Sequence, residues 1–559
     1  MYKKIFAQKI GNNKHKIHLW TDIGYEKVEW TNYAYKECPE ADASHIGLNG
    51  EPLRKTSKWS SDNSGLHFHD MKIHQKFLIE KYGTNDEPST TQKELFFDIE
   101  TEMGDALTVE YIQSAPKKVT SIAWYDKQVN EWGILILDTK NQLKHNKFKN
   151  KEITPVKSEQ ELLAKFLEKF REIDPDILVG YNSDYFDIPY LYYRMCNVLG
   201  EDWARHLSPI GYVRETPWFK DQYIQIAGVE SLDYMRLHKK YSWADEPSWK
   251  LDAIGEKYAG MNKIEYEGNL DTLFETDIQK FIQYNFVDVE ILVKLDEKLE
   301  YLALTKNLSH KGKHNYSEVY ANTNTQDGAI SAYLLSKNII PPAKDKDGKA
   351  EKGYAGGYLF CPKAGIYNYM FDEDLTSLYP SIIMSLNIGK ETLMARIKTT
   401  DDRNNRLGLD DLKLKDPNEI VTILKDKKRA ELPINKLVEH IEKNQWTISA
   451  NGTMYATNRQ SVLSTILAKW FSERVFYKGE MKKAFKSGNK ELGTSFHMKQ
   501  YTMKILLNSL YGATALPSFR YGNVQLSKSI TLSGQRIIQE SALAANRHMN
   551  KVIKNEIML

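Results

Sequence analysis

The first half of the chain alternates short apolar runs with one strong helical stripe. The segments ELFFDIETEM (94–103) and KVTSIAWYD (118–126) are apolar, β-branched or aromatic runs with polar borders, which predicts buried strands. Apolar residues then recur at helical spacing: Leu162, Leu163, Phe166, Leu167 and Phe170. This stripe predicts a helix that ends at Asp174-Pro175, followed by a short buried strand in DILVGYN. Strands followed by a helix and another strand predict an α/β domain over residues 94–300.

The remaining segments differ in composition and in their pattern of apolar residues. Residues 1–93 mix strand-like runs such as KIHLWTDI with polar connections, and residues 395–450 are charged and irregular. Two long helical patterns over 461–512 flank SGNKELGTS, and the final stretch is a long amphipathic helix. Lysine- and asparagine-rich stretches near 305–316 and 343–352 indicate boundaries.

Length and composition bound the class of protein. A chain of 559 residues is too long for one core and predicts roughly three to five domains of about 100–200 residues. Lys+Arg 77 against Asp+Glu 74 leaves a net charge of +3, so any nucleic-acid surface must be local. Widely spaced cysteines without a CxxC pair argue against a disulfide framework or a zinc site. No signal peptide or long apolar run is evident, so we expect a cytoplasmic protein without a membrane span.

Acidic residues in three segments suit a metal site. Asp98 and Glu100 lie two apart on a predicted strand and share one face, which is unfavourable unless a cation lies between them. Alone, the pair also fits a strand end with two solvated acids. Asp187 follows a buried strand, and Tyr284 and Asp288 lie four apart on one helix face. Together they predict a two-cation site with oxygen ligands and a tyrosine that steers an attacking water, hence phosphodiester hydrolysis.

The order and wording of these segments resemble the Exo I, Exo II and Exo III motifs of the 3′–5′ proofreading exonuclease domain in family B DNA polymerases. The resemblance implies an RNase H-like fold and Mg2+ as the cofactor, with Mn2+ as an alternative. It assigns Asp98, Glu100, Asp187 and Asp288 as metal ligands and Tyr284 as the residue that positions the water. It covers essentially the whole chain, loosely before residue 90 and in 395–450. The wording most resembles the T-even-type phage branch, which implies a host cytoplasmic location.

The segment DEDLTSLYPSII is similar to motif A of the same family. The resemblance implies that Asp374 binds both catalytic metals and that the carbonyl of Leu375 binds one of them. It also implies that backbone N–H groups of the next turn bind the triphosphate. The residues of that turn are Ser377, Leu378 and Tyr379. Tyr379 would stack beneath the sugar and exclude a 2′-hydroxyl, although a strand-end aromatic is the alternative. The extra acids Asp372 and Glu373 depart from the motif.

The segment KILLNSLYG resembles motif B, and Lys504, Asn508 and Tyr511 share one helix face. The resemblance implies that Lys504 contacts the triphosphate and that the other two line the nascent base-pair pocket. Arg474 and Lys478 lie four apart on the preceding helix. The planar guanidinium of Arg474 suits bidentate contact with a phosphate. The alternative is that both residues belong to a solvated helix face. YAGGYLFCP resembles the segment that links exonuclease and palm.

The resemblance divides the chain into six parts. We expect an N-terminal domain (1–93), the exonuclease domain (94–300), a return to the N-terminal domain or linker (301–345), a first palm part (346–460), helical-hairpin fingers (461–516) and a second palm part (517–559).

Motif C, the second palm aspartate segment of the family, has no counterpart. No aspartate follows Asp426, so Asp374 lacks its expected partner in this sequence. Three interpretations remain: the N-terminal subunit of a split polymerase, a truncated polymerase or interrupted gene, and a stand-alone nuclease or DNA-binding scaffold with a vestigial polymerase half. The first implies primer-template DNA, dNTPs and a second chain with motif C and the thumb as partners. A sliding clamp and replisome proteins would bind through that second chain.

Overall fold

The computed structural model describes most of the chain. Not described are residues 60–62, 64, 105–107, 144, 217–223, 243, 346–355, 361–363, 367–373, 400–406, 426–427 and 554–559. Predictions on Tyr354, Asp372 and Glu373 therefore lie outside the described residues. Within the described part, no helix is both long and apolar enough to cross a lipid bilayer.

The chain forms two compact units, each assembled from two segments. Unit 1 comprises Met1–Asn32 and Lys72–Ala321, and unit 2 comprises Tyr33–Met71 and Asn322–Leu559. Both units contain helices and sheets, so the predicted mixed α/β architecture is confirmed. The six finer domain boundaries stay predictions.

The strands of unit 1 form a three-stranded sheet, a seven-stranded sheet and a two-stranded ribbon. The three-stranded sheet holds β1 (Tyr2–Lys9), β2 (Lys14–Thr21) and β3 (Gly24–Thr31). The seven-stranded sheet holds β8 (Glu94–Thr101), β9 (Val119–Asp126), β10 (Glu131–Leu137), β11 (Lys147–Phe148), β12 (Lys151–Val156), β13 (Ile177–Gly180) and β16 (Glu230–Asp233). The ribbon pairs β14 (Val213–Glu215) with β15 (Ile224–Ile226).

The helices of unit 1 include those that carry the acidic segments. They are α1 (Ile73–Tyr82), α2 (Val109–Ser114), α3 (Glu159–Ile173), α4 (Asp187–Leu199), α5 (Glu201–Ala204), α6 (Tyr234–Tyr241), α7 (Leu251–Ile254), α8 (Leu270–Thr276), α9 (Ile278–Leu299) and α10 (Tyr301–Gly312). The stretch near 305–316, expected to mark a boundary, largely forms α10, because Leu304 and Leu308 recur at helical spacing and are buried.

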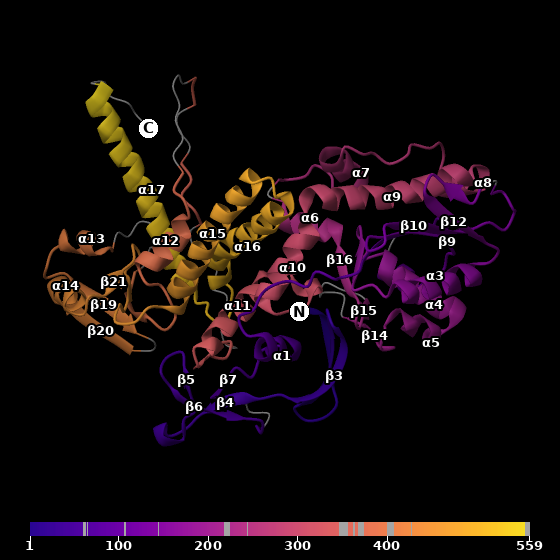
Figure 1. Cartoon of the computed structure of the whole chain (residues 1–559). Coiled ribbons are helices and arrows are strands. Elements are labelled where there is room, and N and C mark those ends of the chain that lie inside the picture. The colour runs from indigo at the N-terminus through magenta and orange to yellow at the C-terminus, as the bar shows by residue number, and fades with distance from the viewer. Residues whose placement is uncertain are drawn as a thin grey trace. The chain divides into compact units, whose positions relative to one another are not determined.

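The seven-stranded sheet places β8 between an antiparallel and a parallel neighbour. Its order is β11-β12-β10-β9-β8-β13-β16, with β9 antiparallel and β13 parallel to β8. The helix α9 packs on β8, β9 and β10, whereas α3 packs on β9, β10 and β12. These helices lie on opposite faces of the sheet (Figure 1). The strands predicted from the apolar runs and the predicted helix over α3 are confirmed.

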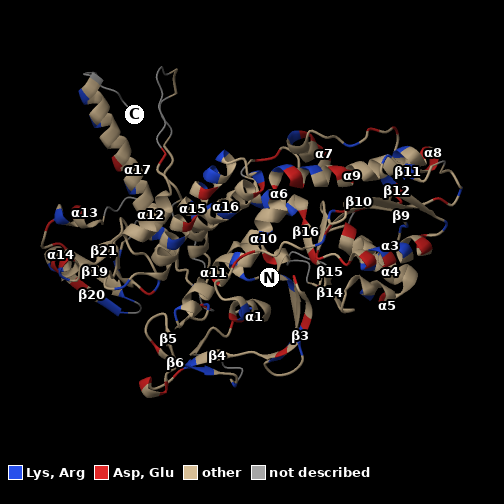
Figure 2. Cartoon of the chain, in the orientation of Figure 1, with Lys and Arg blue, Asp and Glu red and all other residues tan. Residues whose placement is uncertain are grey.

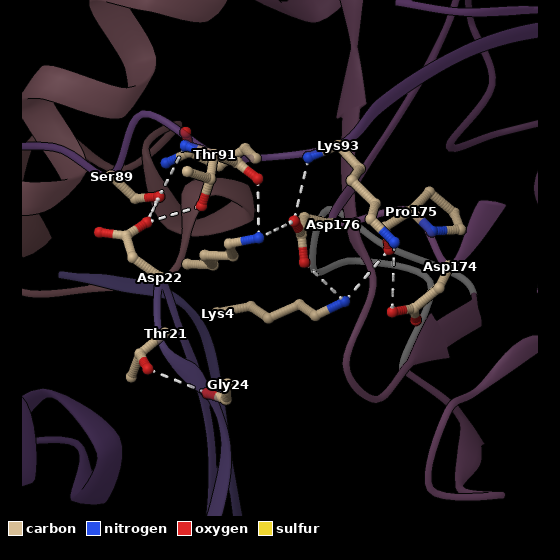
Figure 3. Close-up of polar contacts among 12 residues, drawn as sticks. Lys4, Thr21, Asp22, Gly24, Ser89, Thr91, Lys93, Asp174, Pro175 and Asp176 are labelled. Carbon is tan, nitrogen blue, oxygen red and sulfur yellow. Dashed lines mark hydrogen bonds and ion pairs between the residues drawn. The ribbon is translucent and has the colours of Figure 1, made fainter. Parts of the chain in front are cut away.

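Strand β1 is joined to the segments around β8 and β13 by a buried ion pair (Figure 3). The side chain of Lys4 is fully buried, and its Nζ lies 3.0 Å from Oδ1 of Asp176 and 3.1 Å from the Pro175 carbonyl. The other oxygen of Asp176 lies 3.2 Å from Nζ of Lys3 and accepts the Lys93 N–H at 3.0 Å. Because both charges are paired and hydrogen-bonded, the penalty for burying them is offset.

The strands of unit 2 form two five-stranded sheets. One has the order β17-β5-β6-β4-β7 and contains β4 (Ala34–Glu37), β5 (His45–Gly47), β6 (Pro52–Thr56), β7 (Leu66–His67) and β17 (Ile339–Ile340). The other has the order β20-β19-β18-β22-β21 and contains β18 (Leu393–Ile397), β19 (Ile420–Lys425), β20 (Lys428–Pro433), β21 (Thr447–Ile448) and β22 (Thr453–Tyr455).

The helices of unit 2 include the two long predicted ones. They are α11 (Asn322–Ser336), α12 (Leu378–Ser385), α13 (Leu409–Lys413), α14 (Ile434–Lys443), α15 (Val462–Lys486), α16 (Lys490–Thr514) and α17 (Val524–Ile553). The two helical patterns over 461–512 and the final amphipathic helix are confirmed as α15, α16 and α17. Buried Arg520 joins the segments of this unit, with ion pairs to Asp70 at 2.6 Å and Asp327 at 2.8 Å.

The stretch 395–450, which the sequence left irregular, contains an ordered sheet with its own core. Buried Ile397, Leu412, Leu437 and Met454 belong to one apolar cluster. The strands were hard to recognise because they are short and charged residues interrupt them: most of β20 is exposed and lacks an apolar face.

Candidate active sites

The central strand β8 presents two carboxylates on one face of the seven-stranded sheet. Leu95, Phe97 and Ile99 belong to the core cluster that also includes residues of α3 and α4. Because side chains alternate along a strand, Asp98 and Glu100 project from the opposite face, which α9 covers. This alternation explains how a strand with an apolar core side also carries two acids.

Two other elements complete the cluster. Asp288 and Tyr284 both lie on α9, four residues apart, and both are buried. Asp187 lies in the first turn of α4, and its Oδ1 accepts the Ile99 N–H at 3.3 Å. The three separate acidic segments are thus brought together by the fold.

Carboxylate oxygens gather within the span of a metal site. One oxygen each from Asp98, Glu100 and Asp288 lie within 4.8 Å of one another. Burial, and then the charge of Asp288, raise the pKa of Asp98 well above its ordinary value and that of Glu100 to about 8. Burial also raises the pKa of Asp187 to about 7 and that of Asp288 to about 6. This concentration of negative charge favours a bound cation.

A lysine amine already lies against this cluster. Lys263 Nζ donates to Oδ2 of Asp288 at 2.5 Å and to the Tyr284 hydroxyl oxygen at 3.1 Å. Despite its own desolvation, the charges of Asp288 and Asp98 raise the pKa of Lys263, which therefore carries a full positive charge. The amine thus supplies one cation beside the carboxylates. No sequence pattern indicated Lys263 as a site residue, because it lies in an irregular segment between α7 and α8.

The residues present fit divalent metal ions. Their donors are carboxylate oxygens, which Mg2+ and Mn2+ prefer. The second oxygen of Asp288, Oδ1, is buried and has no hydrogen-bond partner among the described residues, so it has a free ligand position. A pocket of about 610 Å³ opens beside the cluster and is lined by residues that include Asp98, Lys263, Trp249 and Tyr181.

Asn285 orients one of the carboxylates and was not predicted as a site residue. Its Nδ2 donates to Oδ2 of Asp98 at 2.7 Å, while its Oδ1 accepts from the Ser121 hydroxyl at 2.8 Å. Asn285 is fully buried on α9. The sequence does contain a signal for Asn285. It is a polar residue three positions before Asp288 on the same helix face, where an apolar residue would otherwise be expected.

We predict that Asn285→Ala lowers the phosphodiester hydrolysis predicted for this cluster about 10–100-fold, because residues that orient metal ligands have effects of this size. The half-saturating Mg2+ concentration should rise as well, which a simple loss of stability would not cause. Titration of activity with Mg2+ measures both quantities. Activity and Mg2+ dependence like those of the unsubstituted chain would contradict the positioning role.

The second predicted site lies in unit 2 around the start of α12. Asp374 is exposed and belongs to no helix or strand, and residues 371–373 of its predicted strand lie outside the described part. Ser377 has a left-handed conformation (φ 55°) and precedes the first residue of α12, Leu378. The N–H groups of Leu378 and Tyr379 lie in this first turn, where helical N–H groups lack intrahelical partners and can donate to an anion. A cavity of about 810 Å³ beside Leu375 is lined by residues of α12, α13 and α17.

The predicted phosphate-binding residues lie on two helices that pack together. Arg474 and Lys478 are on α15, and Lys504 and Asn508 are on α16. Lysine and arginine residues occur along both helices, whose ribbons are blue at these positions (Figure 2). The Nε of Arg474 is buried without a hydrogen-bond partner among the described residues. A ligand with acceptor oxygens would satisfy it.

Tyr379 and Tyr511, predicted from separate motifs, lie side by side. Their ring centroids are 4.4 Å apart with an interplanar angle of 38°. Burial, and then the charge of the Tyr511 phenol, raise the pKa of Tyr379 above its ordinary value. The structure thus joins motif A to motif B through their aromatic residues.

Comparison with known proteins relates both units to one family. Residues 323–558 match the DNA polymerase family B model, and residues 69–254 match the model of the exonuclease domain of that family. The second match includes Asp98, Glu100 and Asp187 but ends before Tyr284 and Asp288.

Several polymerases are similar along much of the chain. The DNA-directed DNA polymerase of Escherichia phage RB69 is 26% identical over 95% of this chain and 65% of its own length. That of Enterobacteria phage T4 is 26% identical over 71% of this chain and 47% of its own length. A DNA polymerase of Pyrococcus glycovorans is 24% identical, over 84% and 53% respectively. The chain therefore spans about two thirds or less of these relatives.

Proposed function

Because this chain belongs to DNA polymerase family B, as its motifs predicted, we propose that unit 1 is a metal-dependent 3′–5′ DNA exonuclease and that unit 2 carries part of a deoxynucleotidyl transfer site. The observation that carries the nuclease proposal is the cluster of Asp98, Glu100, Asp187 and Asp288. All four belong to unit 1, so this site needs no residue from another part of the chain.

The chain's own residues have distinct roles in the proposed hydrolysis. Divalent ions held by the four carboxylates would activate the attacking water and stabilise the leaving 3′ oxygen. Because Lys263 donates to the Tyr284 oxygen, the phenol hydrogen of Tyr284 is free to bond the attacking water. The ring of Tyr266 packs edge-on against Tyr284, with centroids 5.4 Å apart, and restricts its position.

The test is digestion of 5′-labelled single-stranded DNA by the purified 559-residue chain. With Mg2+ or Mn2+ we expect a ladder of products that shorten from the 3′ end, and EDTA should stop the reaction. A 3′-labelled substrate should release labelled mononucleotide first. Internal cleavage, or digestion from the 5′ end, would contradict the proposal.

For unit 2 we propose that Asp374 is one of the carboxylates of a two-metal transfer site. Arg474, Lys478 and Lys504 would contact the triphosphate, while Asn508 and Tyr511 would line the base-pair pocket. A two-metal site requires more than one carboxylate to offset the repulsion between its ions. A further acidic segment must therefore approach Asp374, and no aspartate follows Asp426 in these 559 residues.

The segment that completes the site is proposed to be polypeptide bearing motif C and the thumb. As the subunit of a split polymerase, this chain would receive it from a second chain, which would also bring the clamp and replisome contacts. The alternatives are a truncated polymerase or interrupted gene, and a nuclease or DNA-binding scaffold whose polymerase half is vestigial. Template-dependent extension after addition of the motif C polypeptide favours a polymerase that lacks this segment, and its absence favours the vestigial polymerase half.

Tyr379 is proposed to exclude ribonucleotides. We predict that Tyr379→Ala increases ribonucleotide incorporation relative to deoxyribonucleotide incorporation at least about tenfold, since lost exclusion of one hydroxyl is worth over 1 kcal/mol. Asp374-dependent extension should persist. The measurement is the ratio of kcat/KM values for the two nucleotides in the form of the protein that extends a primer. An unchanged ratio would show that the ring does not select the sugar.

A further inference from the structure

The ring of Tyr379 lies directly against the backbone of a glycine on another helix of unit 2. Gly534 is buried on α17, which packs against α12. A Cβ atom at Gly534 would lie 2.9 Å from Cε1 and 3.5 Å from Cδ1 of Tyr379. Ordinary van der Waals contact begins near 3.4 Å, so the nearer distance leaves no room for a methyl group. Glycine is therefore the residue that fits this helix position with the ring in place.

The same helix also holds Tyr511, the ring beside Tyr379. The hydroxyls of Tyr511 and Thr531 are 2.6 Å apart, and Thr531 lies three residues before Gly534 on α17. The Thr531 hydroxyl donates to the Ser527 carbonyl at 2.9 Å. Its hydrogen is thus committed, so Tyr511 is the donor and Thr531 the acceptor. Helix α17 contacts one ring through Gly534 and fixes the other through Thr531.

We propose that Gly534 is a positioning residue for sugar selection: the bare backbone of α17 sets how far the ring of Tyr379 withdraws from the nucleotide. The inference rests on the proposed role of Tyr379 in excluding a 2′-hydroxyl. A methyl group at Gly534 requires the ring to move by the difference between 3.4 and 2.9 Å, or to repack. Side chains of a binding site must hold their positions to within about 0.5 Å, so this displacement is large enough to affect selection.

The direction of the effect follows from the neighbours of the ring. Gly534 lies on α17 against the Cε1 and Cδ1 edge of the Tyr379 ring, and Tyr511 packs beside that ring. A methyl group at Gly534 therefore pushes the ring edge away from α17, toward the proposed nucleotide. Gly534→Ala should weaken binding of deoxyribonucleotides themselves. Shortening Tyr379 to valine should remove the collision, so the two substitutions should be coupled.

The first measurement is thermal unfolding of the 559-residue chain. We expect Gly534→Ala to lower Tm by about 1–2 °C, because overpacking destabilises the fold but the large unfolding entropy of a long chain keeps Tm shifts small, and to have no such effect in the Tyr379→Val background. Gly479→Ala on α15 is the matched control, since a Cβ there meets nothing within 4 Å. An equal loss of Tm in both backgrounds would overturn the proposed contact.

The second measurement is nucleotide selection by the form of the protein that extends a primer. Gly534→Ala should raise KM for dNTPs about fivefold or more with little change in kcat, which indicates weakened binding, and should add nothing to Tyr379→Val. If Tyr379→Val leaves the ribonucleotide ratio unchanged, the proposed role of Tyr379 fails. If it relaxes selection while Gly534→Ala leaves KM unchanged, or raises it equally in both backgrounds, the inference about Gly534 is overturned.

Discussion

Asp98→Ala is expected to abolish 3′–5′ digestion of single-stranded DNA, with a loss of at least about 1,000-fold, because metal ligands supply several kcal/mol of transition-state stabilisation. Asp98 contributes a central oxygen of the cluster with Glu100 and Asp288. Its removal also leaves the amide of Asn285 without its acceptor. Both geometry and charge are lost. The measurement is the single-turnover rate of nucleotide release at saturating Mg2+.

The matched control is Glu110→Gln, which removes one negative charge from an exposed position of unit 1. It should retain full nuclease activity. The Asp98→Ala chain should remain folded and should unfold at a temperature no lower than that of the unsubstituted chain, since it removes one of four mutually repelling carboxylates. Robust digestion by the Asp98→Ala, Glu100→Ala double variant would refute the assignment of this cluster as the nuclease site.

Asp374→Asn is expected to abolish primer extension while leaving the nuclease unchanged. The two sites use different residues, and those of the nuclease all belong to unit 1. The 559-residue chain alone should extend primers negligibly, because Asp374 without a second acidic segment cannot offset the repulsion between two cations. Addition of the motif C polypeptide should restore extension to the unsubstituted chain and not to the Asp374→Asn variant.

The completing polypeptide should also bind stably. The cavity beside Leu375 offers a surface for it, lined by apolar residues such as Leu378, Ile382 and Ile537 and by charged residues such as Asp411 and Arg536. An interface that reconstitutes one domain should bury more than about 2,000 Å², as obligate complexes do. Extension by the 559-residue chain alone, or failure of the motif C polypeptide to co-purify with it, would refute this account of unit 2.

The elements that carry the proposed nuclease residues were predictable because each is strongly patterned. Apolar residues fill β8 on both faces up to Asp98, and the helical stripe from Leu162 to Phe170 fixes α3. The spacing of Tyr284 and Asp288 places both on one helix face whatever the tertiary structure. The local sequence pattern did not predict that the three acidic segments lie close together in the fold. That prediction required the resemblance to a known family.

The remaining features depend on contacts between segments far apart in the sequence. Lys263 lies in a connection that has no periodic pattern of apolar residues. Its contact with Asp288 in the folded chain identifies it as a site residue. In the sequence, Gly534 is one glycine in an amphipathic helix and has no distinguishing pattern. Its role is inferred from the contact with the ring of Tyr379 in the folded chain. The sheet over 393–455 was missed because its strands are short and interrupted by charges, so burial, rather than alternation, defines them.

The most direct test of the nuclease assignment is the anomalous difference map of a crystal of this chain soaked in Mn2+. Bound Mn2+ should give a peak among the carboxylates of Asp98, Glu100 and Asp288, with the Lys263 amine moved away from Asp288. The same soak of an Asp98→Ala crystal should lack that peak. A map of the unsubstituted chain with no peak in the cluster at saturating Mn2+, and with Lys263 still bonded to Asp288, would contradict the account.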